Sequence, residues 1–149
     1  MLKDILVELY ERDLGRLKAE IEQYSDDADL WKVSGGITNS AGNLTLHLIG
    51  NLKHFIGTVL GNSGFVRDRD AEFSTKGVSR KDMLAEIDAT AAVLKSTLEK
   101  LTDDDLASLY PIEVFGKPMT TGFFLTHLTT HFTYHLGQIN YHRRLSSSS

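Results

Sequence analysis

Four segments of the chain repeat apolar residues every three or four positions, and no segment alternates apolar with polar residues for long enough to indicate a sheet. Such a repeat places apolar side chains on one face of a helix, because a helix has about 3.6 residues per turn. Four helices of about 20 residues would each be roughly 30 Å long, which is typical of a four-helix bundle. The spacing therefore predicts an all-α fold with this architecture.

Residues that favour helix ends set the expected boundaries. The first helix is expected over residues 2–23, the second ends at Gly61-Asn62, and the fourth ends at about Leu145. Ser, Thr, Asn and Asp side chains cap helix N-termini. Candidate caps precede the other three helices: Ser40 or Asn43, Ser79 or Asp82, and Thr120 or Thr121. The third helix has the most regular apolar stripe, which indicates a core face or a dimer seam: Leu84, Ile87, Ala91, Leu94, Leu98 and Leu101.

Long connections join the helices, at about residues 24–39, 61–78 and 102–119. Loops between packed helices usually have about 2 to 8 residues, so these longer ones can cross the bundle or build a site. A simple up-down-up-down order therefore does not follow. The 149 residues fit one domain, predicted over residues 1–145, with the serines of residues 146–149 as a flexible tail.

The composition excludes several classes of function. The chain has no cysteine, which excludes disulfides, thiolate metal sites and a cysteine nucleophile, so any thiol must come from a substrate. A net charge of −4 with dispersed Lys and Arg argues against nucleic acid as a partner. No apolar run reaches the roughly 18 to 20 residues of a membrane span, and no signal peptide is recognisable. We expect a cytoplasmic protein.

All six histidines lie in the second and fourth predicted helices. In the fourth, His127, His131 and His135 are four residues apart, so successive side chains lie one turn apart on nearly the same face. Two adjacent imidazoles of this row can bind one ion at about 2.0 to 2.1 Å, and a third ligand must come from another helix. His47, at the edge of the apolar face of the second helix, is the natural third ligand.

Three neutral imidazoles with open coordination positions are typical of catalytic sites for Zn, Ni or Fe. A lone histidine on an apolar face is more often a core residue, so it is the row of histidines, with more on a second helix, that favours a metal. His54 tests how the two helices run, because it should be level with His127 if they are antiparallel and nearer His142 if they are parallel.

Other polar residues are candidates for supporting or substrate-binding roles. Asn51 and Gln138 fall beside the predicted ligands, where metal-bound histidines usually donate their second N–H to an oxygen. His54 and His127 are also candidates. Either Arg67 or Arg69 could bind a substrate carboxylate, although alternating charges in a loop are more often surface ion pairs.

Two stretches of sequence resemble the metal-bearing helices of the DinB-like superfamily. They are LTLHLIGNLKHF at residues 44–55 and HFTYHLGQINYHRR at residues 131–144. The family pattern has one histidine on the second helix and HxxxH on the fourth. This resemblance maps the metal ligands onto His47, His131 and His135, and it spans essentially the whole domain.

The resemblance implies a bundle with non-standard connectivity, a homodimer, and a divalent ion (Ni, Zn or Fe) at the three histidines. It also implies an enzyme that uses a low-molecular-weight thiol with an electrophilic substrate for transfer or isomerisation. The alternative is a non-catalytic module for metal binding or for dimerisation under stress. Nucleic-acid binding is a third possibility, but it conflicts with the negative net charge. Three further histidines are not part of the minimal family pattern: His54, His127 and His142.

Overall fold

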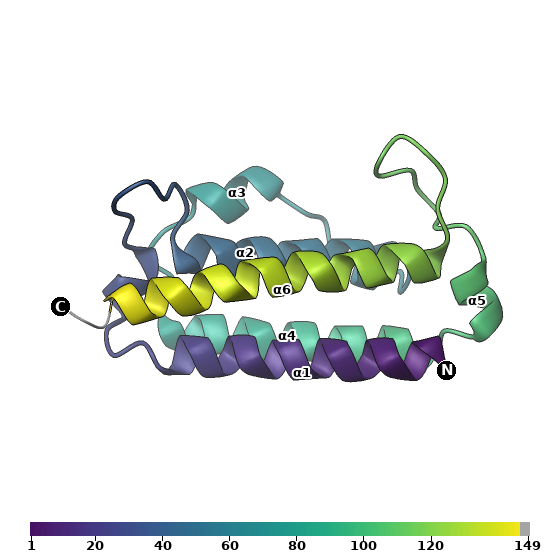
Figure 1. Cartoon of the computed structure of the whole chain (residues 1–149), viewed down its shortest axis with the longest axis horizontal. Helices are drawn as coiled ribbons and strands as arrows, with labels where there is room; N and C mark the ends of the chain where they lie inside the picture. The colour runs from purple at the N-terminus through teal and green to yellow at the C-terminus, as the bar shows by residue number, and fades with distance from the viewer. Residues whose placement is uncertain (147–149) are drawn as a thin grey trace.

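The computed structural model describes residues 1–146 of the chain. Two of the four long helices, α1 (Leu2–Glu22) and α4 (Arg80–Glu99), lie side by side on one side of the molecule. The other two, α2 (Ala41–Leu52) and α6 (Thr121–Ser146), form the opposite side (Figure 1). Within the described part of the chain there is no strand, only one isolated bridge. The predicted all-α four-helix bundle is confirmed.

The helix directions differ from a simple up-down-up-down bundle. Figure 1 shows that α1 and α6 run one way along the long axis, whereas α2 and α4 run the other way. Because α2 and α4 are parallel, the chain between them must return along the length of the bundle. The returning segment carries a short helix, α3 (Arg69–Ser74), which packs against α2. The long second connection predicted from the sequence is therefore a crossover.

Because α2 and α6 are antiparallel, His54 is expected near the level of His127 rather than His142. After Leu52, α2 continues into a π-helical turn, η2 (Lys53–Thr58). The ring of Phe55 in η2 lies 5.1 Å from that of Phe124, near the start of α6. His47, earlier in α2, lies beside later residues of α6. His54 is thus towards the His127 end of α6, as expected for antiparallel helices.

Polar side chains cap the N-termini of α2 and α4, whereas α1 begins after Met1 without a side-chain cap. The side chains of Ser40 and Ser79 accept hydrogen bonds from backbone N–H groups in the first turns of α2 and α4, so the first of each predicted pair of caps is the correct one. Each long connection also contains a short helix that the apolar spacing does not reveal, because five or six residues cannot repeat the pattern. Besides α3, these are η1 (Asp27–Trp31, a 3₁₀ helix) and α5 (Asp103–Ala107).

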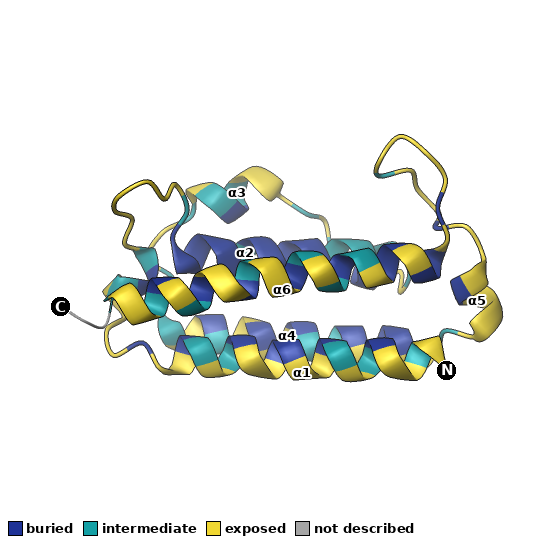
Figure 2. Ribbon diagram, viewed as in Figure 1, coloured by how far each residue is buried: buried dark blue, intermediate teal, exposed yellow. Residues whose placement is uncertain are grey.

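The core runs along the centre of the bundle between the two helix pairs, and the buried stripes of all four helices face it (Figure 2). The predicted stripe of the third helix needs one correction. Met83 is completely buried, whereas Leu84 is only half-buried. The stripe therefore begins one residue earlier than the sequence spacing suggested, while Ile87, Leu94 and Leu98 are buried as expected.

Two further expectations concern the chain end and membranes. Ser146, expected in the tail, is the last residue of α6, and its hydroxyl donates to the backbone oxygen of His142 at 2.8 Å. The other predicted tail residues, 147–149, lie outside the described residues. Among residues 1–146, no helix combines the length and the apolar character that crossing a membrane requires.

Candidate metal centre

Three histidines from two helices converge on one point in the half of the bundle formed by α2 and α6. One ligand nitrogen from each of His47, His131 and His135 lies within 4.8 Å of the others. The Nε2 atoms of His47 and His131 are 3.1 Å apart. Two nitrogens that bind one ion at about 2.0–2.1 Å lie roughly 2.9 to 3.4 Å apart at octahedral to tetrahedral angles. The measured separation therefore fits two ligands of one ion.

The geometry follows from the local helical structure. His131 and His135 lie one turn apart on α6, and their ring centroids are 4.6 Å apart. His47 faces them from α2, with ring centroids 5.1 Å from His131 and 5.2 Å from His135. His47 is buried, whereas His131 and His135 are half-buried. The three rings thus surround a point that is walled by α2 on one side and open on another.

The orientation of the His47 ring is set by Glu72 of α3. His47 Nδ1 lies 3.0 Å from the carboxylate oxygen Oε1 of Glu72. A carboxylate only accepts hydrogen bonds, so Nδ1–H of His47 donates, which leaves the lone pair of the neutral ring on Nε2. A carboxylate behind a histidine in this way is the arrangement found behind many metal-bound histidines, where it fixes the ring and raises its basicity.

His135 is oriented in the same manner by a neighbour on its own helix. Its Nδ1 lies 2.7 Å from the side-chain oxygen of Gln138, so Nδ1–H donates and Nε2 is left with a lone pair. Gln138 therefore contacts one of the predicted ligands, and its supporting role stays a prediction. In the neutral rings of His47 and His135, the outer nitrogen, Nδ1, thus carries the hydrogen, and the inner nitrogen, Nε2, is available to bind a cation.

Glu72 is itself held firmly. The Arg67 guanidinium donates to both of its carboxylate oxygens, at 2.8 and 3.0 Å, and both side chains are largely buried. The Asn43 amide donates to the backbone oxygens of Glu72 and Thr75, which fixes α3 on α2. Although burial alone would raise it, the hydrogen bonds from His47 and Arg67 lower the pKa of Glu72 below its ordinary value. Glu72 is therefore a carboxylate at neutral pH.

His131 and His135 are held in the neutral form that binds metals. Burial, together with the nearby rings of His135 and His47, lowers the pKa of His131 to about 4. Burial also lowers the pKa of His135. With both rings neutral and the Nε2 lone pair of His47 facing His131, a cation or a proton is needed between the facing nitrogens. Three such imidazoles with one open side could hold a divalent ion and leave coordination positions for a substrate.

The other histidines singled out from the sequence do not belong to the group of three. The ring of His127 lies near those of Phe115 and Phe124, with centroid distances of 4.9 and 6.2 Å. Burial and the charge of Arg67 lower the pKa of His54 in η2, whose ring lies 4.8 Å from that of Phe55. His142 lies outside the centre, with Nδ1 2.6 Å from the hydroxyl of Tyr24.

The two arginines have partners within the protein. Arg67 is bound to Glu72, and its guanidinium lies 5.7 Å from the ring centre of Phe55. The Arg69 guanidinium lies 5.3 Å from the ring centre of Phe73. Of the two, only Arg67 contacts one of the three histidines, with its guanidinium 3.4 Å from Nδ1 of His47, and the substrate-binding role predicted for one of them stays a prediction. Asn51 is buried in α2, and its side-chain oxygen has no hydrogen-bond partner.

Sequence reasoning missed Glu72. A single glutamate in a loop with other charges gives no sign that it will be buried, and its helix is only six residues long. Two features of the sequence are consistent with a buried Glu72. Asp68 is a good cap for a helix that contains Glu72, and Gly50 interrupts the buried face of α2 directly opposite the carboxylate.

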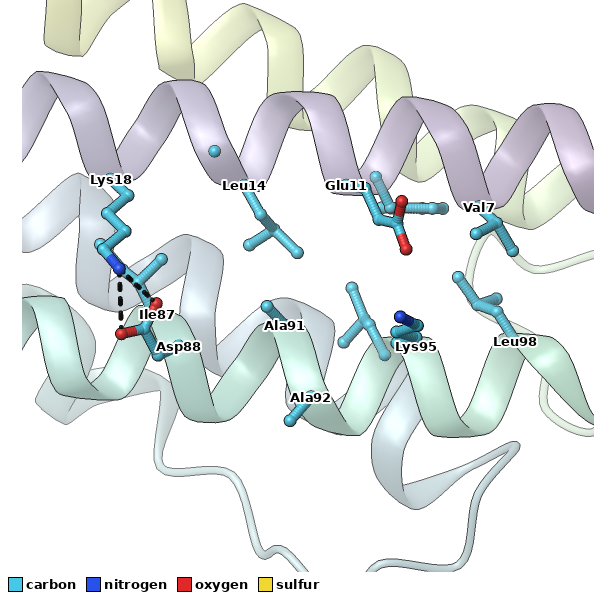
Figure 3. A pocket seen from close by; sticks show the side chains of 13 residues that line it. Val7, Glu11, Leu14, Lys18, Ile87, Asp88, Ala91, Ala92, Lys95 and Leu98 are labelled. Atoms are coloured by element: carbon cyan, nitrogen blue, oxygen red, sulfur yellow. Dashed lines mark hydrogen bonds and ion pairs between the residues drawn. The ribbon is translucent and has the colours of Figure 1, made fainter.

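A separate apolar groove of about 300 Å³ lies between α1 and α4, on the side of the bundle away from the histidines (Figure 3). Leu14 and Ala91 line it, while Lys18 and Asp88 form an ion pair of 2.9 Å at its edge. The groove contains no histidine and is distinct from the candidate metal centre.

Comparisons with known proteins place the chain in a family. The fold is similar to a conserved protein from Enterococcus faecalis, with a TM-score of 0.78 and 17% identity over 98% of this chain and 97% of that one. It is also similar to a DinB-like protein from Bacillus cereus, with a TM-score of 0.74 and 18% identity over 95% and 91% of the two chains. No curated protein matches the chain. The model of a family described as proteins of unknown function, DUF1572, matches residues 7–148. The chain therefore belongs to the DUF1572 family, which is a DinB-like family.

Proposed function

We propose that this protein is a divalent-metal-dependent enzyme whose ion is held by His47, His131 and His135. The observation that carries the proposal is the 3.1 Å distance between the Nε2 atoms of His47 and His131. In addition, Glu72 accepts a hydrogen bond from Nδ1 of His47, and Gln138 accepts one from Nδ1 of His135. Hydrogen bonds of this kind hold imidazoles in the tautomer that binds metals. Imidazole suits Zn, Ni and Fe, which are the candidate ions.

The proposed reaction is transfer or isomerisation that uses an external low-molecular-weight thiol and an electrophilic small molecule. A divalent ion at this site would lower the pKa of a bound thiol or water. The chain has no cysteine, so the thiol has to be a substrate. The half-buried His131 and His135 leave one side of the site accessible to it.

Residues of this chain would position the substrates. Glu72 and Arg67 hold His47 rigidly, which limits the reorganisation needed during a reaction. Phe73 lies 4.9 Å from the ring of His47 and Tyr134 lies 5.3 Å from that of His135, so aromatic surface borders the site from both α3 and α6. Either Arg67 or Arg69 is proposed to orient a carboxylate of a substrate, and a homodimer is proposed as the working form.

Metal analysis tests the proposal. Protein without a histidine tag is incubated with Zn²⁺, Ni²⁺ or Fe²⁺, desalted, and analysed for bound metal. We expect about one ion per chain in the wild type and strong loss in His131→Ala. His127→Ala is the matched control, because it removes a histidine one turn earlier on α6 and should keep its metal. Equal metal content in the wild type and His131→Ala would exclude this centre.

Activity and metal content have to be measured separately, because the alternative is a non-catalytic module. The metal-loaded protein is assayed with low-molecular-weight thiols and a panel of electrophiles, before and after treatment with a chelator. Thiol consumption that depends on the metal and is lost in His131→Ala supports the enzyme. A protein that binds metal, consumes no thiol, and keeps its partner or its dimer without metal would favour the module.

A further inference from the structure

Two buried side-chain atoms within residues 1–146 lack a hydrogen-bond partner, and they belong to α2 and α6, the two helices that carry the three histidines. One is Nδ1 of His131 and the other is the side-chain oxygen Oδ1 of Asn51. Buried polar atoms are nearly always paired in folded proteins, so each unpaired one calls for an explanation. Two in one region, one able to donate and the other able to accept, point to a shared explanation.

The helix geometry brings these two residues to the same region. Asn51 follows His47 by one turn on α2, so the two side chains project from nearly the same face. His47 contacts His131 directly, with Nε2 atoms 3.1 Å apart. Because α2 and α6 are antiparallel, the turn after His47 on α2 advances along α6 towards His131 and His127. Asn51 is only 6% exposed, and its side-chain oxygen is buried.

Metal binding by His131 would require a hydrogen-bond acceptor beside its Nδ1 atom. A neutral imidazole that binds a cation through one nitrogen carries a proton on the other, and that N–H needs an oxygen. His47 donates to Glu72 and His135 donates to Gln138. His131 alone among the three has no acceptor, and Asn51 Oδ1 is the unpaired acceptor that the fold supplies.

We propose that Asn51 is a positioning residue for His131, accepting the Nδ1–H hydrogen bond of that ring when the centre binds its ion. Asn51 then does for His131 what Glu72 does for His47. The inference rests on the proposed function, because it assigns the last unpaired nitrogen of the same centre. Two neutral amides and one carboxylate would support the three ligands, so that only His47 is backed by a negative charge.

Zinc affinity, measured by competition with a chromophoric chelator, tests the role of Asn51. Asn51→Leu keeps the approximate size but removes the acceptor, and Asn51→Asp restores one. We expect Asn51→Leu to bind Zn²⁺ about 10- to 100-fold more weakly than the wild type, and Asn51→Asp to recover most of the loss. Thr45→Val, a buried polar-to-apolar change on the same helix, is the control and should leave the affinity unchanged.

A second measurement separates positioning from a merely structural role. The metal-free Asn51→Leu protein should melt at or above the wild-type temperature, because the change removes a buried unpaired oxygen. In the zinc-loaded wild type, nitrogen-15 NMR should show a protonated His131 Nδ1 that exchanges slowly with water, and this holds as a test even if Asn51→Leu fails to fold.

Failure of the metal centre and failure of the Asn51 role give different results. Wild-type protein that binds no Zn²⁺, Ni²⁺ or Fe²⁺ overturns the metal centre and the role of Asn51 with it. Wild-type protein that binds zinc, with equal affinity in Asn51→Leu, overturns the role of Asn51 alone. A rapidly exchanging or unprotonated His131 Nδ1 in the zinc-loaded protein likewise overturns the role of Asn51 and leaves the metal centre in place.

Discussion

Gly50 of α2 and Glu72 of α3 occupy complementary positions: a Cβ atom at Gly50 would overlap the carboxylate of Glu72. The absence of a side chain at residue 50 is what allows the carboxylate to reach His47 from outside the bundle. A residue with no functional group of its own thus determines whether the candidate metal centre has its supporting carboxylate.

Replacing Gly50 tests this relationship. In Gly50→Ala the new methyl group has to displace Glu72, and we expect a loss of about 1–3 kcal/mol in the free energy of unfolding together with weaker metal binding. Gly15→Ala on α1 is the control, because its added Cβ meets nothing within 4 Å. It should instead stabilise the protein by roughly 0.5–1 kcal/mol, as alanine does in place of glycine within a helix. Urea unfolding measures both, and equal effects would contradict the steric argument.

Removing the charge of Glu72 should affect both stability and metal binding. Glu72→Gln leaves the largely buried Arg67 guanidinium without its carboxylate, so we expect a loss of about 1–3 kcal/mol. Zinc affinity should fall about 10- to 100-fold, because His47 loses its charged partner. Glu86→Gln breaks a half-exposed ion pair with Lys53 and should change stability by less than about 1 kcal/mol, with no change in zinc affinity. Unaltered zinc binding by Glu72→Gln would argue against the role of the carboxylate.

Metal removal should lower the thermal stability of the wild type alone. An ion that binds only the folded state stabilises it by about 2.7 kcal/mol at a free concentration 100 times its dissociation constant. We therefore expect calorimetry to show a higher melting temperature with zinc, which chelation reverses. His131→Ala should melt at the same temperature in zinc and in chelator. A comparable zinc-dependent rise in that variant would place the ion elsewhere.

The lowered pKa of His131 makes the metal-free protein sensitive to acid. An unfolded histidine takes up a proton near pH 6.5, whereas His131 in the folded protein does so only at about 4. The unfolded state therefore binds more protons between these values, and stability should fall as the pH drops from about 6.5 to about 4. Urea unfolding of the chelated protein at pH 7 and pH 5 measures the fall. His131→Phe should show a smaller one, and an equal fall would contradict the lowered pKa.

The helices and the pair on α6 were predictable because both depend on short distances along the chain. Apolar residues three and four apart indicate one face of a helix whatever it packs against. His131 and His135 lie one turn apart in any helix that contains them, so their ability to share an ion is a local property. Ser40 and Ser79 likewise mark helix starts through hydrogen bonds within one turn.

His47 was predictable only in part. Its position at the edge of an apolar face made it the natural third ligand, and the resemblance to a known family pointed to the same residue, but the spacing could not show that the second and fourth helices are neighbours. The structure shows His47 beside His131 and His135 because α2 and α6 are adjacent and antiparallel. The same resemblance implied a divalent ion, and the three rings have a geometry that could hold one.

The amino-acid sequence by itself determined where the helices lie and which of them carry imidazoles, since these depend on neighbours within a turn or two. Only the tertiary structure decided that Glu72 reaches His47, since the two are 25 residues apart and joined by a segment that folds back along the bundle. Packing α2 parallel to α4 requires that return. A carboxylate in a charged loop thereby becomes a buried partner of the candidate metal centre.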